Sequence, residues 1–418
     1  MPSSVRTFLA TSLSVLLLAA AAVVLQTAPA AALAAQRFAS PTGTTADSCA
    51  TPADACRIDK AINGALAGDE VVLAPGTYTA PVQLTNTEAI TIRGASASNR
   101  PVINAATGNG LFLSSGGDIA VRDLEIVHTG SNVGLLVFGA GVVERVSVRS
   151  SGSSACAASY YALVRDSLCV STGPGGAAIE ASVGTAGAPS YTPRLRNVTA
   201  VATGVGGTGI DISMDGPAIT YTLDMRNVIA RGSVDVDRQA VSGATVVVTA
   251  ASSSYATVTQ SGAGSVTPAG SGGNQTAAPQ FVDTTRFRQK PTSPTVDAGT
   301  GAPDLGTTDL DGDPRTVGTA PDIGTDELPD TTAPESRISK HPKKKTFSKR
   351  AKFRFSSPDP TATFRCKLDK KAVKPCTSPF TKKKLKIGRH VFRVWAVDTY
   401  GNADATPAKY SWKVKRRD

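Results

Sequence analysis

The chain has 418 residues and a formal net charge of +11, and this charge is unevenly divided. Residues 332–418 contain 25 of the 44 Lys and Arg but only 6 of the 33 Asp and Glu, so the preceding residues are acidic overall. This change in composition excludes one uniform domain. The sequence has no second apolar run of bilayer-spanning length after the N-terminal one, which excludes a protein with several membrane spans.

The N-terminus has the features of an export signal. Arg6 precedes an apolar run over residues 9–25, and small residues suitable for cleavage follow at 32–34. This pattern predicts a secretory signal peptide over residues 1–35, with a single membrane anchor as the alternative. We therefore expect a secreted protein, extracellular or associated with the cell surface, that keeps no transmembrane segment once the signal is removed.

The six cysteines form three local pairs, and export favours their oxidation to disulfides. Metal binding is the rival interpretation, but none of the pairs has CxxC spacing or a nearby His. The expected disulfides are Cys49–Cys56, Cys156–Cys169 and Cys366–Cys376.

Residues 56–67 have apolar side chains at helical spacing and predict one short amphipathic helix. Residues 68–78 follow with a turn, a strand and a Pro-Gly turn. A helix just before the first strand would cap the open edge of a stack of strands, which would otherwise pair with another chain.

An apolar residue followed by Arg and then by Asp or Asn recurs along the chain. The complete copies begin at Val121, Val164, Leu195 and Met225, and residues 92–94 form an incomplete first copy. Units of this size, built from short strands and Gly-rich turns, cannot bury a core alone and must stack into a coil of β-strands. We interpret the Asp and Asn positions as a structural bend.

A second series of strands aligns with this repeat, and alternation assigns an interior and an exterior residue to each strand. The predicted interior residues are Leu111, Leu135, Ile179, Ile210 and Val234. The exterior residues that follow them are Phe112, Leu136, Glu180, Asp211 and Asp235.

The helix and the sequence Gly-Asp-Glu-Val-Val-Leu-Ala-Pro-Gly-Thr-Tyr at 68–78 resemble the start of exported right-handed parallel β-helix proteins with the pectin-lyase-like fold. Residues 309–315 and 321–324 are similar to the signature that closes many of those coils. The resemblance covers about residues 45–328 and implies an architecture without implying an activity. The predicted β-helix, with its N-terminal capping helix, occupies residues 36–328.

The sharpest candidate for chemistry is the stack of Glu180, Asp211 and Asp235, because crowded carboxylates raise a pKa or recruit a cation. With Arg196 nearby, they are candidates for β-elimination or acid–base cleavage of an acidic polysaccharide. The alternative is a solvated strand face. Three motifs of active polygalacturonases, namely paired aspartates, Gly-His-Gly and Arg-Ile-Lys, are missing from the sequence, which argues against an enzyme. Further candidate binding residues are Asp215, Asp237, Tyr160 and Tyr161.

Asp309, Asp311 and Asp313 have the alternating carboxylate spacing of a calcium-binding loop. Pro314 follows them directly and no Glu stands at the twelfth position, so a tight turn is the alternative. Calcium is the one cofactor that the sequence suggests.

Residues 329–334 contain two prolines and form the expected linker. Residues 335–418 alternate apolar and polar side chains in short strands, which predicts a small antiparallel β-sandwich. The stretches 364–369, 375–379 and 388–402 resemble a family of bacterial Ig-like domains found on exported proteins. That resemblance implies an accessory or adhesive module, and the fold class of the whole chain is all-β.

The lysine runs 343–345 and 382–384 predict a surface that attracts polyanions, with solubility as the alternative explanation. No known reader of nucleic-acid sequence is present. We expect a non-catalytic surface or matrix protein that binds polysaccharide along the coil and anionic cell-envelope material through the basic Ig-like domain. The alternatives are a polysaccharide lyase or glycoside hydrolase acting on acidic polysaccharide, and an adhesin that contacts other proteins.

Overall fold

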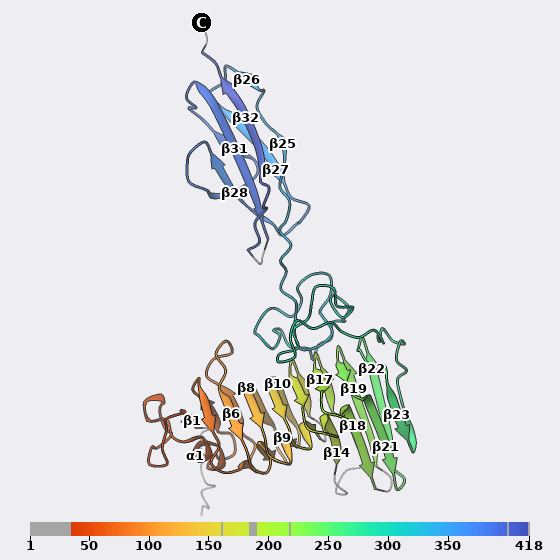
Figure 1. The fold of residues 1–418 in the computed structure, drawn as a ribbon. Helices are drawn as coiled ribbons and strands as arrows, with labels where there is room; N and C mark the ends of the chain where they lie inside the picture. The colour runs from red at the N-terminus through yellow and green to blue at the C-terminus, as the bar shows by residue number, and fades with distance from the viewer. Residues whose placement is uncertain (1–34, 160–161, 184–189, 217–218, 399–400, 417–418) are drawn as a thin grey trace, which may run out of the picture.

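The computed structural model describes residues 35–159, 162–183, 190–216, 219–398 and 401–416. Strands dominate these residues, and the helical elements among them are the 3-10 turn η1 (Pro52–Asp54) and the α-helix α1 (Ile58–Asn63). The strands up to β24 pair in parallel and form a coil, while the later ones form antiparallel sheets with one short parallel pair (Figure 1). The all-β fold class, a parallel β-helix followed by an antiparallel sandwich, is confirmed. The predicted signal peptide lies outside the described residues except for Ala35.

The larger sheet of the coil has 16 strands and forms two of its faces. One face contains β1 (Gln36–Ala39), β2 (Glu70–Leu73), β5 (Thr91–Gly94), β8 (Ile119–His128), β10 (Gly141–Ser150), β12 (Leu163–Arg165), β16 (Arg194–Arg196), β19 (Thr220–Arg226), β22 (Thr245–Ala251) and β24 (Ala263–Val266), with β15 (Ser190–Tyr191) beside β19. The other face contains β3 (Thr77–Thr79), β6 (Val102–Ala105), β13 (Leu168–Ser171), β17 (Thr199–Ala202) and β20 (Ile229–Arg231). The long strands β8 and β10 pair with both rows and therefore turn a corner of the coil.

The remaining face of the coil is an eight-stranded parallel sheet, here called the outer sheet. Its strands are β4 (Leu84–Asn86), β7 (Leu111–Ser114), β9 (Val133–Phe138), β11 (Ser154–Ala158), β14 (Ala177–Val183), β18 (Thr208–Asp215), β21 (Val234–Val241) and β23 (Val258–Ser261). Consecutive turns of the chain add one strand each, so the register between neighbours fixes which side chains stack along the whole coil.

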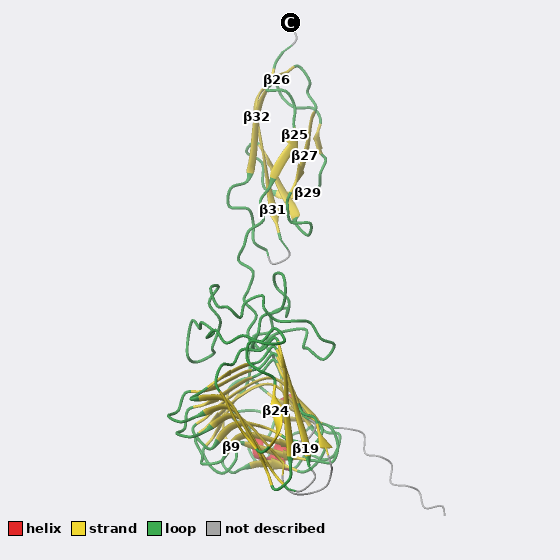
Figure 2. Ribbon diagram, turned by 90° about the vertical axis from the view of Figure 1, so that its right-hand side faces the viewer, coloured by secondary structure: helices red, strands yellow, loops and turns green. Residues whose placement is uncertain are grey.

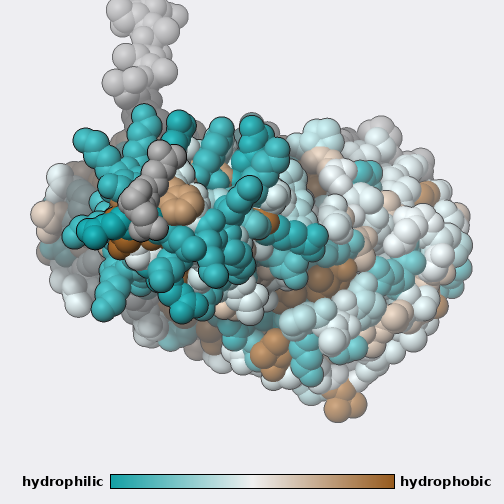
Figure 3. Space-filling view, turned by 90° about the horizontal axis from the view of Figure 1, so that it is seen from above, coloured by the Kyte–Doolittle hydropathy of each residue, from teal (hydrophilic) through white to brown (hydrophobic). Residues whose placement is uncertain are grey.

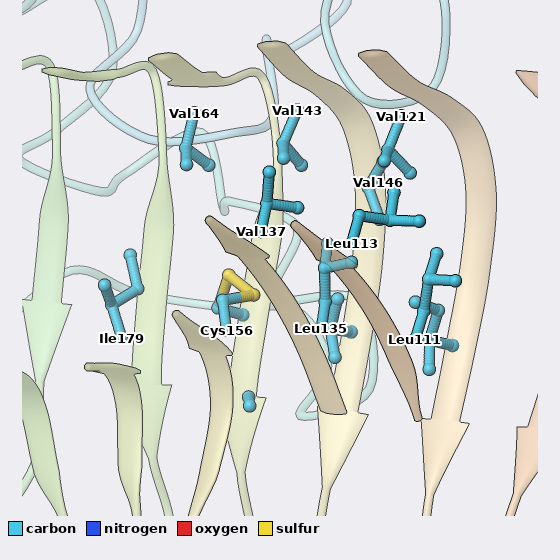
Figure 4. Packing of buried hydrophobic residues seen from close by; sticks show 14 of the residues in the cluster. Leu111, Leu113, Val121, Leu135, Val137, Val143, Val146, Cys156, Val164 and Ile179 are labelled. Carbon is cyan, nitrogen blue, oxygen red and sulfur yellow. A yellow bond between two sulfur atoms is a disulfide. The ribbon is translucent and has the colours of Figure 1, made fainter. Parts of the chain in front are cut away.

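Buried, mainly aliphatic side chains from both sheets fill the coil in parallel columns (Figure 4). Leu111, Leu135, Ile179 and Ile210 occupy matching interior positions on successive strands, as predicted, with Cys156 between Leu135 and Ile179. Val234 was wrongly assigned to this column, because the register places Val236 opposite Ile210. A fully buried Leu or Ile contributes roughly 1.5–3 kcal/mol, so the stacked aliphatic columns together are the main stabilising element of the coil.

The Arg positions of the sequence repeat form one row across the larger sheet, which confirms the stacked arrangement. The row consists of Arg93, Arg122, Glu144, Arg165, Arg196 and Arg226. The copy at residues 143–145 was missed because Glu144 stands where Arg recurs. Glu144 contacts Arg122 at 3.3 Å, Arg145 at 2.8 Å and Arg165 at 3.0 Å, and so separates charges of the same sign.

The residue after each Arg turns the chain, as the sequence predicted. Asp123, Asp166, Asn197 and Asn227 have φ between 48° and 56°, in the left-handed region that Asn and Asp tolerate. The Asn197 amide donates to Asp166 Oδ1 at 2.9 Å, and the Asn227 amide donates to Asn197 Oδ1 at 2.9 Å. The side chains therefore link one turn of the coil to the next, which is a structural role.

Helix α1 closes the N-terminal end of the coil, but it is shorter than the predicted span of residues 56–67. Ile58, Ala61 and Ile62 are buried, and the helix ends at Asn63 with Gly64 as its C-cap. Strand β1 precedes the helix and pairs with β2, a strand that the sequence did not suggest. Its four residues, Gln-Arg-Phe-Ala, are two polar residues followed by two apolar ones, so the strand shows no alternation.

All three predicted disulfides are present, and the described residues contain no free cysteine. Cys49–Cys56 lies beside the capping helix. Cys156–Cys169 joins β11 of the outer sheet to β13 of the larger sheet inside the core. Cys366–Cys376 joins adjacent strands of the C-terminal sandwich.

Residues 277–328, here called the closing segment, form loops that cover one side of the coil (Figure 2) and contact the Arg row. Asp304 contacts Arg194 at 3.1 Å and Arg196 at 2.9 Å, and the Arg149 guanidinium donates to two backbone carbonyls of the segment. Arg315 is buried and reaches Asp166 at 3.4 Å. Arg165 and Arg226 of the repeat donate to backbone carbonyls of the segment as well. Arginines of the repeat thus help to attach this segment to the coil, a role that the sequence pattern did not reveal.

The C-terminal part of the chain folds as two sheets around a core of its own. Three strands, β25 (Arg337–Lys340), β27 (Ala351–Ser356) and β30 (Phe380–Lys382), form one sheet. The other sheet contains β26 (Lys345–Thr346), β32 (Ala408–Val414), β31 (Gly388–Val397), β28 (Thr363–Leu368) and β29 (Lys374–Cys376). Phe353 and Phe392 stack at the centre with ring centroids 4.1 Å apart. This is the two-sheet sandwich that the alternation predicted.

Within the described residues, no helix has the length and apolar character needed to cross a membrane.

Replacing Glu144 with Gln should destabilise the coil. The substitution keeps the shape of the side chain but leaves Arg122, Arg145 and Arg165 without their shared carboxylate, at a cost of about 2–4 kcal/mol. The free energy of unfolding should be measured in urea by circular dichroism, because both tryptophans lie in the sandwich. The control is Glu125→Gln, which breaks an exposed pair with Arg286 and should cost less than about 1 kcal/mol. Equal losses would contradict the role given to Glu144.

Candidate functional site

The candidate site is the solvent side of the outer sheet, where one exterior residue per strand forms a row. In order from the N-terminal end, the row contains Thr85, Phe112, Leu136, Ala157, Glu180, Asp211, Asp237 and Thr259. Neighbouring members lie about 4.8 Å apart along the coil. Thr85 and Thr259 stand at its two ends. Between them, the first half is apolar (Phe112, Leu136 and Ala157) and the second half is acidic (Glu180, Asp211 and Asp237).

The acidic half contains Glu180, Asp211 and Asp237 rather than the predicted Asp235. Asp235 is buried near the start of β21, where its carboxylate accepts backbone N–H bonds from Gly232 and Ala256 and pairs with Arg231 at 3.0 Å. It therefore has a structural role. The sequence Val-Asp-Val-Asp at 234–237 repeats every two residues, so a shift of one repeat preserves the alternation and the pattern could not distinguish the registers.

Asp211 has the most unusual environment of the three carboxyl groups. Burial, with the neighbouring carboxylates of Asp237 and Glu180, raises the pKa of Asp211 to about 6. Its Oδ1 atom is inaccessible to solvent and has no hydrogen-bond partner among the described residues. By contrast, Glu180 accepts a bond from Ser154 Oγ at 2.6 Å, and Asp237 accepts one from Gln239 at 2.9 Å. Asp211 therefore keeps its proton to a higher pH than an ordinary aspartate does.

The apolar half of the row contains half-exposed side chains that stand next to one another. Phe112 and Leu136 occupy neighbouring positions, and Phe138 lies on the same face two residues farther along β9. The rings of Phe112 and Phe138 meet edge to face with centroids 5.9 Å apart. Exposed aromatic rings of this kind provide apolar surface for the faces of sugar rings. The predicted outward orientation of Phe112 and Leu136 is confirmed, although no role was predicted for either residue.

Arg196 does not lie beside these carboxylates. It belongs to β16 in the larger sheet and pairs with Asp224 and Asp304, so it holds the closing segment. Within the strands of the outer sheet, as far as the structure describes them, the basic side chain is Arg238. Its guanidinium points into the coil and donates to Ala263 O at 2.8 Å. The acidic half of the row therefore has no cation from its own sheet.

Of the other predicted binding residues, the structure describes Asp215 but not the two tyrosines. Asp215 is exposed at the end of β18, on the same face as Asp211 but four residues away along the strand. Tyr160 and Tyr161 lie outside the described residues.

The calcium prediction for residues 309–313 is not supported by the arrangement of these side chains. Both carboxylate oxygens of Asp309 accept backbone N–H groups, from Asp313 at 2.8 Å and Glu327 at 3.0 Å. Asp311 instead pairs with Arg286 at 2.8 Å. Across the described part of the chain, no group of three or more His, Cys, Asp or Glu side chains is arranged to hold a metal ion. The turn interpretation accounts for Asp309.

The sandwich offers a separate region, a groove between the free edges of β29 and β30. Three hollows, of about 740, 250 and 730 Å³, follow one another along it. The first two share Leu368, Lys371 and Lys382, and the last two share Pro375 and Cys376. The lysine run 382–384 lines the first hollow. Part of the predicted basic surface therefore lies at this groove.

No protein-family profile and no curated protein matches this sequence. Among solved structures, the chain is similar to the crystal structure of pectate lyase Pel9A, with a TM-score of 0.38 and 14% sequence identity, over 71% of this chain and 96% of that one. A likeness at this level does not bear on activity. The parallel β-helix described above rests on the pairing of its own strands.

Replacing Asp211 with Asn should stabilise the protein at high pH. The raised pKa means that the folded state holds this proton up to about pH 6 while the unfolded chain releases it near pH 4, so the contribution of Asp211 to stability falls as pH rises between these values. The variant should be more stable than the parent by about 1–2 kcal/mol at pH 8, after allowance for solvent screening, and by much less at pH 4.5.

Unfolding in urea at both pH values tests this expectation. The control is Asp215→Asn, which makes the same change in net charge on the same strand face. This variant should leave the difference between the free energies of unfolding at pH 4.5 and pH 8 almost unchanged. A gain of equal size at pH 4.5 and pH 8 for Asp211→Asn would contradict the raised pKa.

Proposed function

We propose that this is an exported cell-surface or extracellular-matrix protein that binds polysaccharide along the outer sheet and anionic envelope material through the basic sandwich. Three disulfides and the predicted signal at residues 1–35 support export.

The observation that carries the polysaccharide proposal is the row on the outer sheet, where apolar rings and carboxylates follow one another in register. Phe112 and Phe138 offer ring faces, and the carboxylates of Glu180, Asp211 and Asp237 accept hydrogen bonds, which suits sugar hydroxyl groups. Three adjacent carboxyl groups repel polyanions. The coil is therefore suited to a neutral glycan, and the basic sandwich to an anionic one.

Binding of the full-length mature chain to an array of neutral glucans, xylans and mannans tests the proposal. Phe112→Ala should weaken retention about tenfold, because the variant loses one stacking contact and the apolar area that this contact buries. The matched control is Phe347→Ala, which removes an exposed Phe from the sandwich and should leave retention unchanged. Thermal unfolding of both variants shows whether the loss is due to binding. The proposal of glycan binding by the outer sheet would be contradicted if the parent chain bound no neutral glycan, or if both variants lost retention equally.

A second candidate, glycoside hydrolysis, is favoured by one specific observation. Asp211 has a pKa of about 6 and lies one rung from carboxylates on either side, the environment of a general acid. The same glycans should be analysed for new reducing ends and for unsaturated ends, the latter reporting elimination. Product formation that is lost in Asp211→Asn but kept in Asp215→Asn would replace binding by catalysis as the function of this face.

A further inference from the structure

We propose that the groove between β29 and β30 of the sandwich, here called the lysine groove, binds a polysaccharide that carries carboxylate groups. This inference rests on the proposed function, since it assigns the anchoring of anionic material to one site and one class of ligand. It differs from a general attraction between a basic domain and any polyanion, because it requires the groove to be the place of contact.

The groove exists because two strand edges remain unpaired. Among the described strands, β29 pairs with β28 alone and β30 pairs with β27 alone. The two sheets therefore part along this side, and the three hollows lie one after another between the edges. Because successive hollows share lining residues, a chain-like ligand could contact all three, whereas a compact ligand would fill one.

The rim of the groove is positively charged and its charges are unpaired. The six rim lysines are Lys371, Lys374, Lys382, Lys383, Lys384 and Lys386. No ion pair within the described residues involves any of them. The acidic residue in the lining, Asp369, already bonds His390 at 2.8 Å and the backbone of Val391 at 2.8 Å. Seen from above, hydrophilic side chains dominate the sandwich surface (Figure 3).

The floor of the groove is apolar, and this feature selects among polyanions. Leu368 and Leu385 line the first hollow, Phe380 the second, and Phe364 the third. Sugar rings have apolar faces that suit such a floor, whereas a polyphosphate has none. Lys presents a compact charge on a flexible stem and suits carboxylates that are spaced along a chain. An acidic polysaccharide meets both requirements at once.

The chain contains a matched pair of lysine runs that separates the groove from overall charge. Lys382, Lys383 and Lys384 line the groove, whereas residues 343–345 lie just before β26 and at its first position, outside all three hollows. Changing either run to three glutamines removes the same charge from the same domain. Carboxymethyl-dextran and unmodified dextran, two probes with one backbone, report the need for carboxylates.

Binding of the full-length mature chain should be measured in about 0.1 M salt, where distant charges are largely screened. We expect binding to carboxymethyl-dextran and not to dextran, a loss of at least about tenfold in the 382–384 variant and a loss below about threefold in the 343–345 variant. Phe364→Ala should weaken carboxymethyl-dextran binding while leaving polyphosphate binding unchanged.

Equal losses in the two lysine variants would overturn the groove while leaving anchoring by a basic sandwich in place. Absence of any binding by the parent chain would overturn both the groove and the proposed anchoring. Tighter binding of polyphosphate or single-stranded DNA than of carboxymethyl-dextran, lost in the 382–384 variant, would overturn the assignment to a polysaccharide. Circular dichroism of each variant verifies that the sandwich is folded.

Discussion

The parallel, in-register stacking of one aliphatic residue on the next is the constraint on which the rest of the coil depends. Leu111, Leu135, Ile179 and Ile210 are buried at matching positions, and a shift of one residue at any strand would turn its whole interior set outward. Once this column is fixed, three other rows are fixed as well: the Arg row, the row of exterior residues on the outer sheet, and the residues that follow the arginines and turn the chain, here called the bend row (Asp123, Asp166, Asn197 and Asn227). The candidate binding face is therefore a consequence of core packing.

Stacking in register also brings like charges together, and the molecule resolves this conflict differently in each row. In the Arg row, Glu144 and Asp304 supply opposite charge. In the bend row, Asn197 and Asn227 replace charged carboxylates with amides that can donate to the rung before them. On the outer sheet the repulsion is left in place, and it adds to burial, the larger cause, in raising the pKa of Asp211. An unrelieved electrostatic cost of this kind is typical of functional surfaces.

The sequence was sufficient for the fold class and for most of the interior column, because aliphatic alternation over many turns has few competing explanations. It was insufficient where the pattern is degenerate or broken: Val234-Asp235-Val236-Asp237 fits two registers, and Glu144 interrupts a row of arginines. Arg196 was placed beside the wrong carboxylates because its partner Asp304 lies 108 residues away. The lysine groove could not be predicted, because it forms where the two sheets of the sandwich separate. Strand alternation shows which side chains face the core, but it does not show which strand edges stay unpaired.

The attachment of the closing segment has a consequence for how the chain reaches its native state. Arg286 meets Glu125 across 161 residues, so contacts of this kind can form only after nearly the whole coil has been synthesised. Such distant contacts slow folding, because a long stretch of chain must be ordered before they form. Attachment of the closing segment is thus a late event in folding, whereas the strands of the coil, which pair with those of the neighbouring turns, can assemble before it.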